Sequence, residues 1–345
     1  MRKLAVTINN LSCGGTERQV TLIVNSLSDY YDVTLLLLSA DKEEKLFFLP
    51  EINKNVRVKN CTTIFTVGNM FKYFWHVLFN KYHIAINFND TGNLVGSVFQ
   101  RIGNPKSEIY NSIRGNKRLN YRYISIWKYF ISGVITNSSE IKDVLQNSYK
   151  IKKPVHVINN GIEPVELEKS LKNDTKKKVV LSVGRINPVK NHFDIIYLAK
   201  SLEGFEFLLI GDIQDQELLS LMSKLDVNNV RFLGAKKDLM PFYKQADMLV
   251  ISSISEGFPN VLLEAINYEI PIISTSVGQI PFVLTDGKDG FLYEAGDTEK
   301  LIRLASGYFL FDDNEKNEMK REIQKLKSKY DINKVVGDLV EVFEN

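Results

Sequence analysis

Cysteine is nearly absent from this sequence of 345 residues, which holds only Cys13 and Cys61. Two cysteines cannot form a disulfide framework or a cysteine metal site, and such a low number is typical of a reducing compartment. Long apolar runs are also missing. The start, MRKLAVTINN, contains too short an apolar run for a signal peptide, and no segment approaches the roughly 18 apolar residues of a membrane span. We therefore expect a cytoplasmic protein that contacts membranes only from their surface.

Metal-binding patterns and a strong net charge are lacking as well. No Asp-x-Asp occurs, and the four histidines show no metal-ligand spacing. We therefore expect neither a metal nor another cofactor. The formal net charge of +3 is too small to indicate a nucleic-acid-binding protein.

What the sequence does contain is an alternation of short apolar runs with helical patterns. Runs such as KLAVTIN, DVTLLLLS and HIAINF come first, and KVVLSVG, FEFLLIG and DMLVIS follow. This pattern is typical of parallel strands joined by helices, and the length favours two domains. The charged, strand-free segment 163–178 marks the boundary, so we predict an α/β protein with two Rossmann-like, doubly wound domains at 1–165 and 166–330. Ligands of such sheets bind at the carboxyl ends of the strands.

The first loop of interest is NNLSCGGTERQV, where Gly14 and Gly15 follow a predicted strand. Thr16 and Gln19 form a capping-box pattern at the start of the next helix. Free N–H groups at a glycine-lined helix start can bind phosphate. A simple tight turn from strand to helix explains the same residues equally well.

The second loop is VGRINPVKN, again directly after a predicted strand. Arg185 and Lys190 lie five positions apart across a loop that contains proline. A guanidinium and an ammonium group that converge on one anion would suit a diphosphate. Taken alone, two solvated surface charges are the simpler interpretation.

The third loop is SEGFPNVLLEA. Pro259 suits a first helical position, which places Glu256 in the loop before the helix and Glu264 more than a turn inside it. The two acids should therefore reach different parts of a ligand. A carboxylate pair on one glycosidic bond is an alternative that this geometry makes awkward, and a helix cap plus a surface glutamate is another.

A basic and aromatic stretch runs from Arg101 to Ile131, with Glu108 as its single acid. The aromatic segment from Met70 to Phe79 precedes it. Cations with Trp and Tyr suit the headgroup region of an anionic membrane. Packing of the aromatic residues in a core, or single-stranded nucleic acid as a partner, are the alternatives.

Six motifs, in this order and spacing, resemble the retaining, nucleotide-sugar-dependent glycosyltransferases of family 4, which have the GT-B fold of two Rossmann-like domains around a cleft. They are GGTER, NNGIE, VGRINPVKN, RFLGAKKDL, ISSISEGFPNVLLEA and STSVGQIPFVLTDGKDGFL. The resemblance covers nearly the whole chain. It implies that 1–165 binds the acceptor, that 166–330 binds the donor, and that the closing helix, at about 331–345, crosses back onto the first domain.

The resemblance also implies roles for single residues. Arg185 and Lys190 match the positions that neutralise the donor diphosphate in place of a metal, and Glu256 and Glu264 match the acids beside the donor sugar and the ribose. The further donor-side positions are Gly14, Gly15, Gly234, Ala235, Lys236, Gly257, Phe258, Pro259 and Asn260. On the acceptor side we place Asn89, Asp90 and Arg114.

The expected function is therefore metal-independent, retaining transfer of a hexose or N-acetylhexosamine, with uridine as the expected base. The expected acceptor is a lipid-linked glycan or oligosaccharide of the cell envelope, at the cytoplasmic face of the membrane. Two departures concern the sugar: many relatives have a histidine near Asn89 and Asp90, and their Gly-Gly is Gly278-Gln279 here. A sugar-nucleotide epimerase and an inactive partner subunit remain alternatives.

Overall fold

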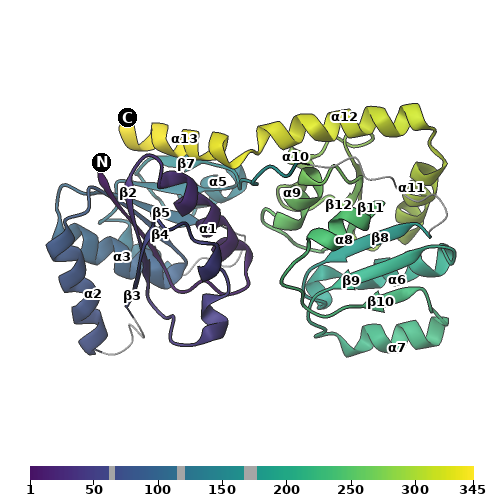
Figure 1. Ribbon diagram of the computed structural model, residues 1–345, viewed down its shortest axis with the longest axis horizontal. Helices are drawn as coiled ribbons and strands as arrows, with labels where there is room; N and C mark the ends of the chain where they lie inside the picture. The colour runs from purple at the N-terminus through teal and green to yellow at the C-terminus, as the bar shows by residue number, and fades with distance from the viewer. Residues whose placement is uncertain (62–66, 115–120, 167–176) are drawn as a thin grey trace. The chain divides into compact units, whose positions relative to one another are not determined.

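The computed structural model describes residues 1–61, 67–114, 121–166 and 177–345. The chain divides into two compact units (Figure 1). Unit 1 comprises Met1–Glu163 together with Asp331–Asn345, and unit 2 comprises Pro164–Tyr330. The first boundary lies two residues before the expected one at 165, and the second lies at the expected position.

Unit 1 is built on a seven-stranded parallel sheet of order β3-β2-β1-β4-β5-β6-β7. This order is that of a doubly wound fold, in which the direction of winding reverses between β1 and β4. The strands are β1 (Lys3–Ile8), β2 (Asp32–Leu37), β3 (Arg57–Asn60), β4 (Ile84–Phe88), β5 (Glu108–Ile113), β6 (Gly133–Thr136) and β7 (Val155–Val157).

Helices cover both faces of this sheet because side chains alternate along each strand. Leu4, Val6 and Ile8 of β1 enter a core with α1 and α13, whereas Ala5 enters a second core with α2, α4 and α5. The helices of unit 1 are α1 (Gly15–Leu27), α2 (Val67–Asn80), α3 (Asp90–Gly103), α4 (Tyr121–Trp127), α5 (Ser139–Asn147) and α13 (Ile332–Glu344). Short 3₁₀ turns lie at Glu43–Leu46 and Leu49–Glu51.

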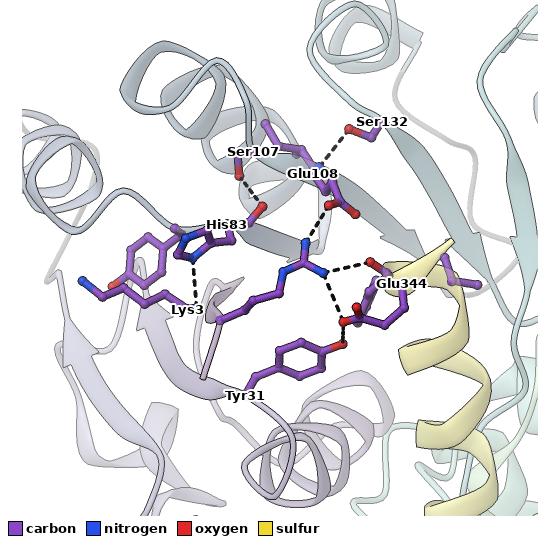
Figure 2. A network of polar contacts seen from close by, with 12 residues as sticks. Lys3, Tyr31, His83, Ser107, Glu108, Ser132 and Glu344 are labelled. Atoms are coloured by element: carbon purple, nitrogen blue, oxygen red, sulfur yellow. Dashed lines mark hydrogen bonds and ion pairs between the residues drawn. The ribbon is translucent and has the colours of Figure 1, made fainter.

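The last helix, α13, is fixed to unit 1 by a polar network at the amino ends of β1 and β5. The Arg2 guanidinium donates to Glu108 at 2.6 Å, to Glu344 at 3.1 Å and to the Phe343 carbonyl at 3.2 Å. Tyr31 donates to the same Glu344 carboxylate at 2.8 Å (Figure 2). Phe343 itself is buried in the core beside α1. The network therefore joins both ends of the chain, at the edge of the sheet opposite the strand carboxyl ends.

Unit 2 repeats the same plan with a six-stranded parallel sheet of order β10-β9-β8-β11-β12-β13. Its strands are β8 (Val179–Val183), β9 (Glu206–Ile210), β10 (Val230–Phe232), β11 (Met248–Ile251), β12 (Ile272–Thr275) and β13 (Phe291–Tyr293). Its helices are α6 (His192–Ser201), α7 (Gln216–Leu225), α8 (Met240–Gln245), α9 (Asn260–Asn267), α10 (Ile280–Val283), α11 (Thr298–Leu310) and α12 (Asp313–Lys329), with a 3₁₀ turn, η3, at Pro188–Lys190.

Two local predictions are wrong. The predicted capping box of Thr16 and Gln19 is not formed, because α1 begins after Gly14 without a side-chain cap. The Gln19 amide instead exchanges two hydrogen bonds, both 2.9 Å long, with the backbone of Gly161. Pro259 precedes α9 with an extended ψ of 126° instead of occupying its first turn.

Candidate active site

Three loops of unit 2 hold the charged donor residues Arg185, Lys190 and Glu256, together with Gly278. They follow β8, β11 and β12, which are neighbours in the sheet. Because the strands are parallel, these loops leave the sheet at the same edge. That edge, called here the unit 2 edge, therefore brings together Arg185, Lys190, Glu256 and Gly278.

The loop after β8 is held by tight backbone packing. Gly184 and Gly211 have φ values of +149° and +151°, and a Cβ atom on Gly211 would lie 1.9 Å from the Gly184 carbonyl oxygen. The Asn187 side chain accepts from the Lys190 amide at 3.2 Å and so begins the turn η3. Arg185 is exposed and makes no hydrogen bond or ion pair with any residue that the structure describes.

Lys190 and Glu256 form an ion pair across two of these loops. The Lys190 ammonium donates to Glu256 Oε1, and the Ser253 hydroxyl donates to the same oxygen at 2.6 Å. Both charged side chains are largely buried, at 24% exposed for Lys190 and 11% for Glu256. Ion pairs at this depth hold their geometry better than surface pairs, so the two loops are coupled through this carboxylate.

Glu264 lies about one turn inside α9 and is held by a hydrogen bond of its own. It sits inside α9, where the Tyr243 hydroxyl donates to its Oε2 at 2.7 Å. The Tyr243 ring stacks on Tyr268 with centroids 5.2 Å apart. Glu256 and Glu264 have separate partners: Glu256 accepts from Lys190, and Glu264 accepts from Tyr243.

Gly278 occupies a position that a larger residue could not take. Its φ is +59°, and a Cβ atom there would lie 2.3 Å from the Glu256 carbonyl oxygen and 2.6 Å from that of Gly257. The next residue, Gln279, donates its amide to the Gly257 carbonyl at 2.9 Å. The loops after β11 and β12 therefore approach within backbone contact beside Glu256.

The remaining donor positions border the same edge. Gly234 has a φ of +67°, and its carbonyl accepts from the Gly211 amide at 3.0 Å, while Ala235 and Lys236 are exposed after β10. Phe258 is buried against Tyr330. Asn260 opens α9, directly after Gly257, Phe258 and Pro259.

His192 was not predicted as a site residue, yet it lies beside Lys190. Its side chain is 3% exposed, and its Nδ1 atom is buried without a hydrogen-bond partner among the described residues. Burial, assisted by the Lys190 charge, lowers the pKa of His192 to about 4. It is therefore neutral near pH 7, and with Lys190, Ser252 and Ser253 it lines a pocket at this edge.

The corresponding edge of unit 1, called here the unit 1 edge, holds the predicted acceptor residues. Asn89 has a φ of +62° and immediately precedes α3, so that Asp90 is the first helical residue and is exposed. Gly14 and Gly15 lie at the start of α1, which follows the neighbouring strand β1. The structure thus places these four residues after two adjacent strands.

Arg114 follows β5 at the unit 1 edge and is held by neutral partners. It donates to Asn160 Oδ1 at 2.6 Å and to the Ser112 hydroxyl at 3.1 Å, and its guanidinium lies 5.7 Å from the centre of the Phe88 ring. Burial lowers the pKa of Arg114 to about 10. Its Nη2 atom has no hydrogen-bond partner among the described residues.

Comparison with known families shows what unit 2 resembles. Residues 165–330, which are nearly the whole of unit 2, match the model of the family described as glycosyl transferases group 1. Unit 2 therefore resembles a group 1 glycosyl transferase domain over nearly its whole length.

Curated relatives match this chain over most of their length. An enzyme of Campylobacter jejuni named GalNAc-alpha-(1->4)-GalNAc-alpha-(1->3)-diNAcBac-PP-undecaprenol alpha-1,4-N-acetyl-D-galactosaminyltransferase is 26% identical over 319 residues, which cover 88% of each chain. The amylovoran biosynthesis glycosyltransferase AmsD of Erwinia amylovora is 25% identical and is covered to 85%, with 83% of this chain aligned.

Solved structures resemble the fold of this chain over nearly its whole length. Anabaena HepE in complex with UDP aligns over 100% of both chains with a TM-score of 0.82 and 18% identity. A glycosyltransferase from Rickettsia africae aligns over 99% of this chain and 98% of its own, with a TM-score of 0.83 and 14% identity. The predicted GT-B fold is therefore confirmed.

Neither a metal cluster nor a membrane span is found in the described part of the chain. No group of three or more His, Cys, Asp or Glu side chains there could hold a metal ion. None of the helices in the same residues is long and apolar enough to cross a membrane.

The predicted membrane-facing stretch is exposed only in part. Tyr110 and Trp127 are buried in the two cores, which corrects their inclusion in the surface. Lys117 and Arg118 lie outside the described residues. A cluster of exposed aromatic side chains lies on α2, where Phe71, Trp75 and Phe79 are 57%, 49% and 76% exposed.

Sequence reasoning missed three supporting residues: Ser253, Tyr243 and His192. Ser253 lies only three residues before Glu256, and this closeness in sequence is the one signal that could have found it. Tyr243 and His192 carried no usable signal. Tyr243 is 21 residues from Glu264, and the burial of His192 depends on how β8 and β11 pack around it.

Proposed function

We propose that this chain is a retaining glycosyltransferase that uses a UDP-hexose or a UDP-N-acetylhexosamine as the donor. The acceptor is a hydroxyl group of a lipid-linked glycan in bacterial cell-envelope polysaccharide synthesis. The observation that carries the proposal is the placing of Arg185, Lys190, Glu256 and Glu264 at or next to one edge of a group 1 unit. The UDP complex of HepE supports the donor class, and the PP-undecaprenol named for the Campylobacter relative supports the acceptor class.

The donor diphosphate binds between Arg185 and Lys190. Arg185 is exposed without a described partner, so its guanidinium can engage phosphate oxygens at little cost. Lys190 adds a second positive charge from the same loop. These two cations from one loop supply the charge that other transferases obtain from a bound metal, so the reaction requires no metal.

The two ends of the donor bind to the two acids. Glu264, held by Tyr243, accepts hydrogen bonds from the ribose hydroxyls, and Glu256 accepts one from the donor sugar. The base lies against the exposed backbone at Gly234–Lys236. The separate supports of the two acids suit one ligand that spans both.

Transfer occurs on one face of the sugar. The bond between the anomeric carbon and the diphosphate oxygen breaks as the acceptor oxygen bonds to that carbon on the same side. The proton of the acceptor hydroxyl passes to a phosphate oxygen of the departing UDP. Arg185 and Lys190 stabilise the negative charge that develops on UDP, and each such donor contributes a factor of about 10² to 10³.

The acceptor binds at the unit 1 edge, near Asn89, Asp90 and Arg114. The lipid end of the acceptor lies in the cytoplasmic face of the membrane, which this protein contacts from the surface. On α2, Phe71, Trp75 and Phe79 are exposed next to Lys72, a combination that suits an anionic headgroup region. Liposome flotation tests this contact: recovery with anionic vesicles should fall when Trp75 and Phe79 are replaced by serine.

Calorimetric titration of the purified protein with UDP, GDP and ADP tests the donor assignment. Selective binding of UDP, weakened in Glu264→Ala, is the expected result. At 100 times the dissociation constant, bound UDP should add about 2.7 kcal/mol to stability. Sugar-nucleotide epimerisation would identify an epimerase, and UDP binding without transfer to any lipid-linked acceptor would identify an inactive partner.

A further inference from the structure

Glu256 uses its two carboxylate oxygens unequally. Both hydrogen bonds that it accepts, from Lys190 Nζ and from Ser253 Oγ, end on Oε1. No described residue donates to Oε2, and this atom is not among the buried atoms without a partner. Oε2 is therefore the oxygen that remains open to a ligand.

Lys190 has two incompatible tasks. In the absence of a ligand its ammonium is paired with Glu256, and in the donor complex it serves the diphosphate. A point charge that moves toward a diphosphate weakens its bond to the carboxylate. At 11% exposure, Glu256 would then be left with little water to replace that bond.

We propose that Ser253 is a positioning residue that holds Glu256 Oε1 while Lys190 turns to the donor diphosphate. Oε2 thereby stays directed at the donor sugar. This inference rests on the proposed function, because it needs a diphosphate ligand at Lys190.

Ser253 is well placed for this task because it is fixed from the other side. It is 1% exposed, and its carbonyl accepts from the Thr275 hydroxyl of β12 at 2.7 Å. Thr275 is fully buried. The hydroxyl that reaches Glu256 therefore comes from a buried loop residue that lies two positions after β11 and is hydrogen-bonded to β12.

The backbone around Lys190 is fixed as well. The Ser252 hydroxyl donates to the Lys190 carbonyl at 2.8 Å, and the Ile254 amide donates to the Val189 carbonyl at 2.8 Å. These bonds tie the loop after β8 to the loop after β11. The exchange of partners is thus confined to the Lys190 side chain, while Ser253 and Glu256 stay in place.

A double-mutant cycle with Ser253→Ala and Glu256→Gln tests the inference, with UDP as the titrated ligand. Ser253→Ala should weaken UDP binding about tenfold, because UDP then draws Lys190 away from a carboxylate with no other partner. In the Glu256→Gln background the same change should alter UDP affinity by less than about twofold, because no charge is left unpaired.

Ser274→Ala is the matched control. Ser274 is a buried serine of β12 whose hydroxyl donates to the Thr275 carbonyl at 3.1 Å and does not contact Glu256. We expect UDP affinity close to that of the unmodified protein, and thermal unfolding verifies that each variant is folded.

Three results overturn the inference, and they are distinguishable. Unchanged UDP affinity in Ser253→Ala removes the role of Ser253 but leaves the proposed function intact. An equal loss in both backgrounds means that Ser253 acts only on the local structure. Failure of the unmodified protein to bind UDP removes the proposed donor, and the inference with it.

Discussion

The two carboxyl edges of this protein have the same topology and opposite chemistry. At the unit 2 edge, the side chains are mainly charged: Arg185, Lys190 and Glu256. At the unit 1 edge, amides prevail, and Asn137 and Asn160 join each other and Arg114 through hydrogen bonds of 3.3 and 2.6 Å. Charged groups suit a diphosphate, whereas amides both donate to and accept from hydroxyl groups. The difference shows that the loops, and not the shared sheet plan, assign a task to each unit.

The cations at the two edges also differ in their surroundings. Lys190 is paired with a carboxylate. Arg114 has only neutral partners, and its burial without a compensating acid is what lowers its pKa. A buried charge of this kind is costly unless a ligand or water completes its hydrogen bonds. The unit 1 edge therefore holds a buried charge among amides, in addition to the exposed Asp90.

Removing a charged group from the unit 2 edge should break the comparison most severely. We expect Glu256→Ala or Arg185→Ala to lower sugar transfer by about 10² to 10³-fold, since each removes a contact to the donor. The rate of UDP release measures the effect, and circular dichroism verifies folding. Arg303→Ala, at a 68% exposed arginine of α11, is the control. Near-normal turnover in folded Glu256→Ala protein would refute the assignment.

A methyl group on Gly278 should damage the unit 2 edge through its backbone. Gly278→Ala forces a side chain into a left-handed conformation and against the Glu256 carbonyl. We expect a loss of more than about 2 kcal/mol in the free energy of unfolding, measured with urea, together with weaker UDP binding.

Gly307→Ala is the matched control for this change. Gly307 lies inside α11 with no atom within 4 Å of an added Cβ, so alanine should stabilise the protein by up to about 1 kcal/mol. Equal effects at both glycines would mean that Gly278 has no special geometry.

Arg114→Gln tests the comparison at the unit 1 edge, because it removes the buried positive charge there. We expect transfer to the lipid-linked acceptor to be about tenfold slower, because one charge-assisted hydrogen bond is lost, while UDP affinity stays unchanged. Transfer assays measure the first quantity, and calorimetry with UDP measures the second. Arg57→Gln, at an exposed position of the edge strand β3, should change neither. Weaker UDP binding in Arg114→Gln would contradict the division of tasks.

The smallest effect concerns acid sensitivity at the unit 2 edge. His192 is buried as the neutral form, and its pKa falls from an ordinary 6.5 to about 4. The stabilisation that it gives is complete above pH 6.5 and is lost as the pH falls toward 4. At pH 5.5 we expect a loss of about 1 kcal/mol that His192→Asn does not share. Parallel urea-unfolding curves for both proteins from pH 7 to 4.5 would argue against a buried neutral His192.

Much of the fold could be predicted because apolar runs and strand order are local properties. KLAVTIN, HIAINF and FEFLLIG coincide with β1, β4 and β9. Strand β3 escaped prediction because all four of its residues are exposed, so it has no apolar run to detect. The three residues of β13 were too few to stand out from the loop that precedes them.

The candidate site was predictable in its charged residues and not in their supports. Arg185, Lys190 and Glu256 were found by residue type and loop position, and the structure brings Lys190 and Glu256 into contact. The prediction of a capping box at Gln19 was wrong because the Gln19 amide binds Gly161, which is 142 positions away in the sequence. Such long-range hydrogen bonds leave no trace in local spacing.

The ion pair between Arg2 and Glu344 joins two segments that are synthesised at very different times. On the ribosome, unit 2 is synthesised before α13. The apolar residues of β1 and α1 that pack against α13 therefore remain uncovered during that time. Leu339 and Phe343 cover them only after the whole of unit 2 has been synthesised. The nascent chain therefore exposes an apolar surface for the time needed to add more than half of its residues, about 10 to 40 s at roughly 5 to 20 residues per second, an interval in which chaperone binding is expected.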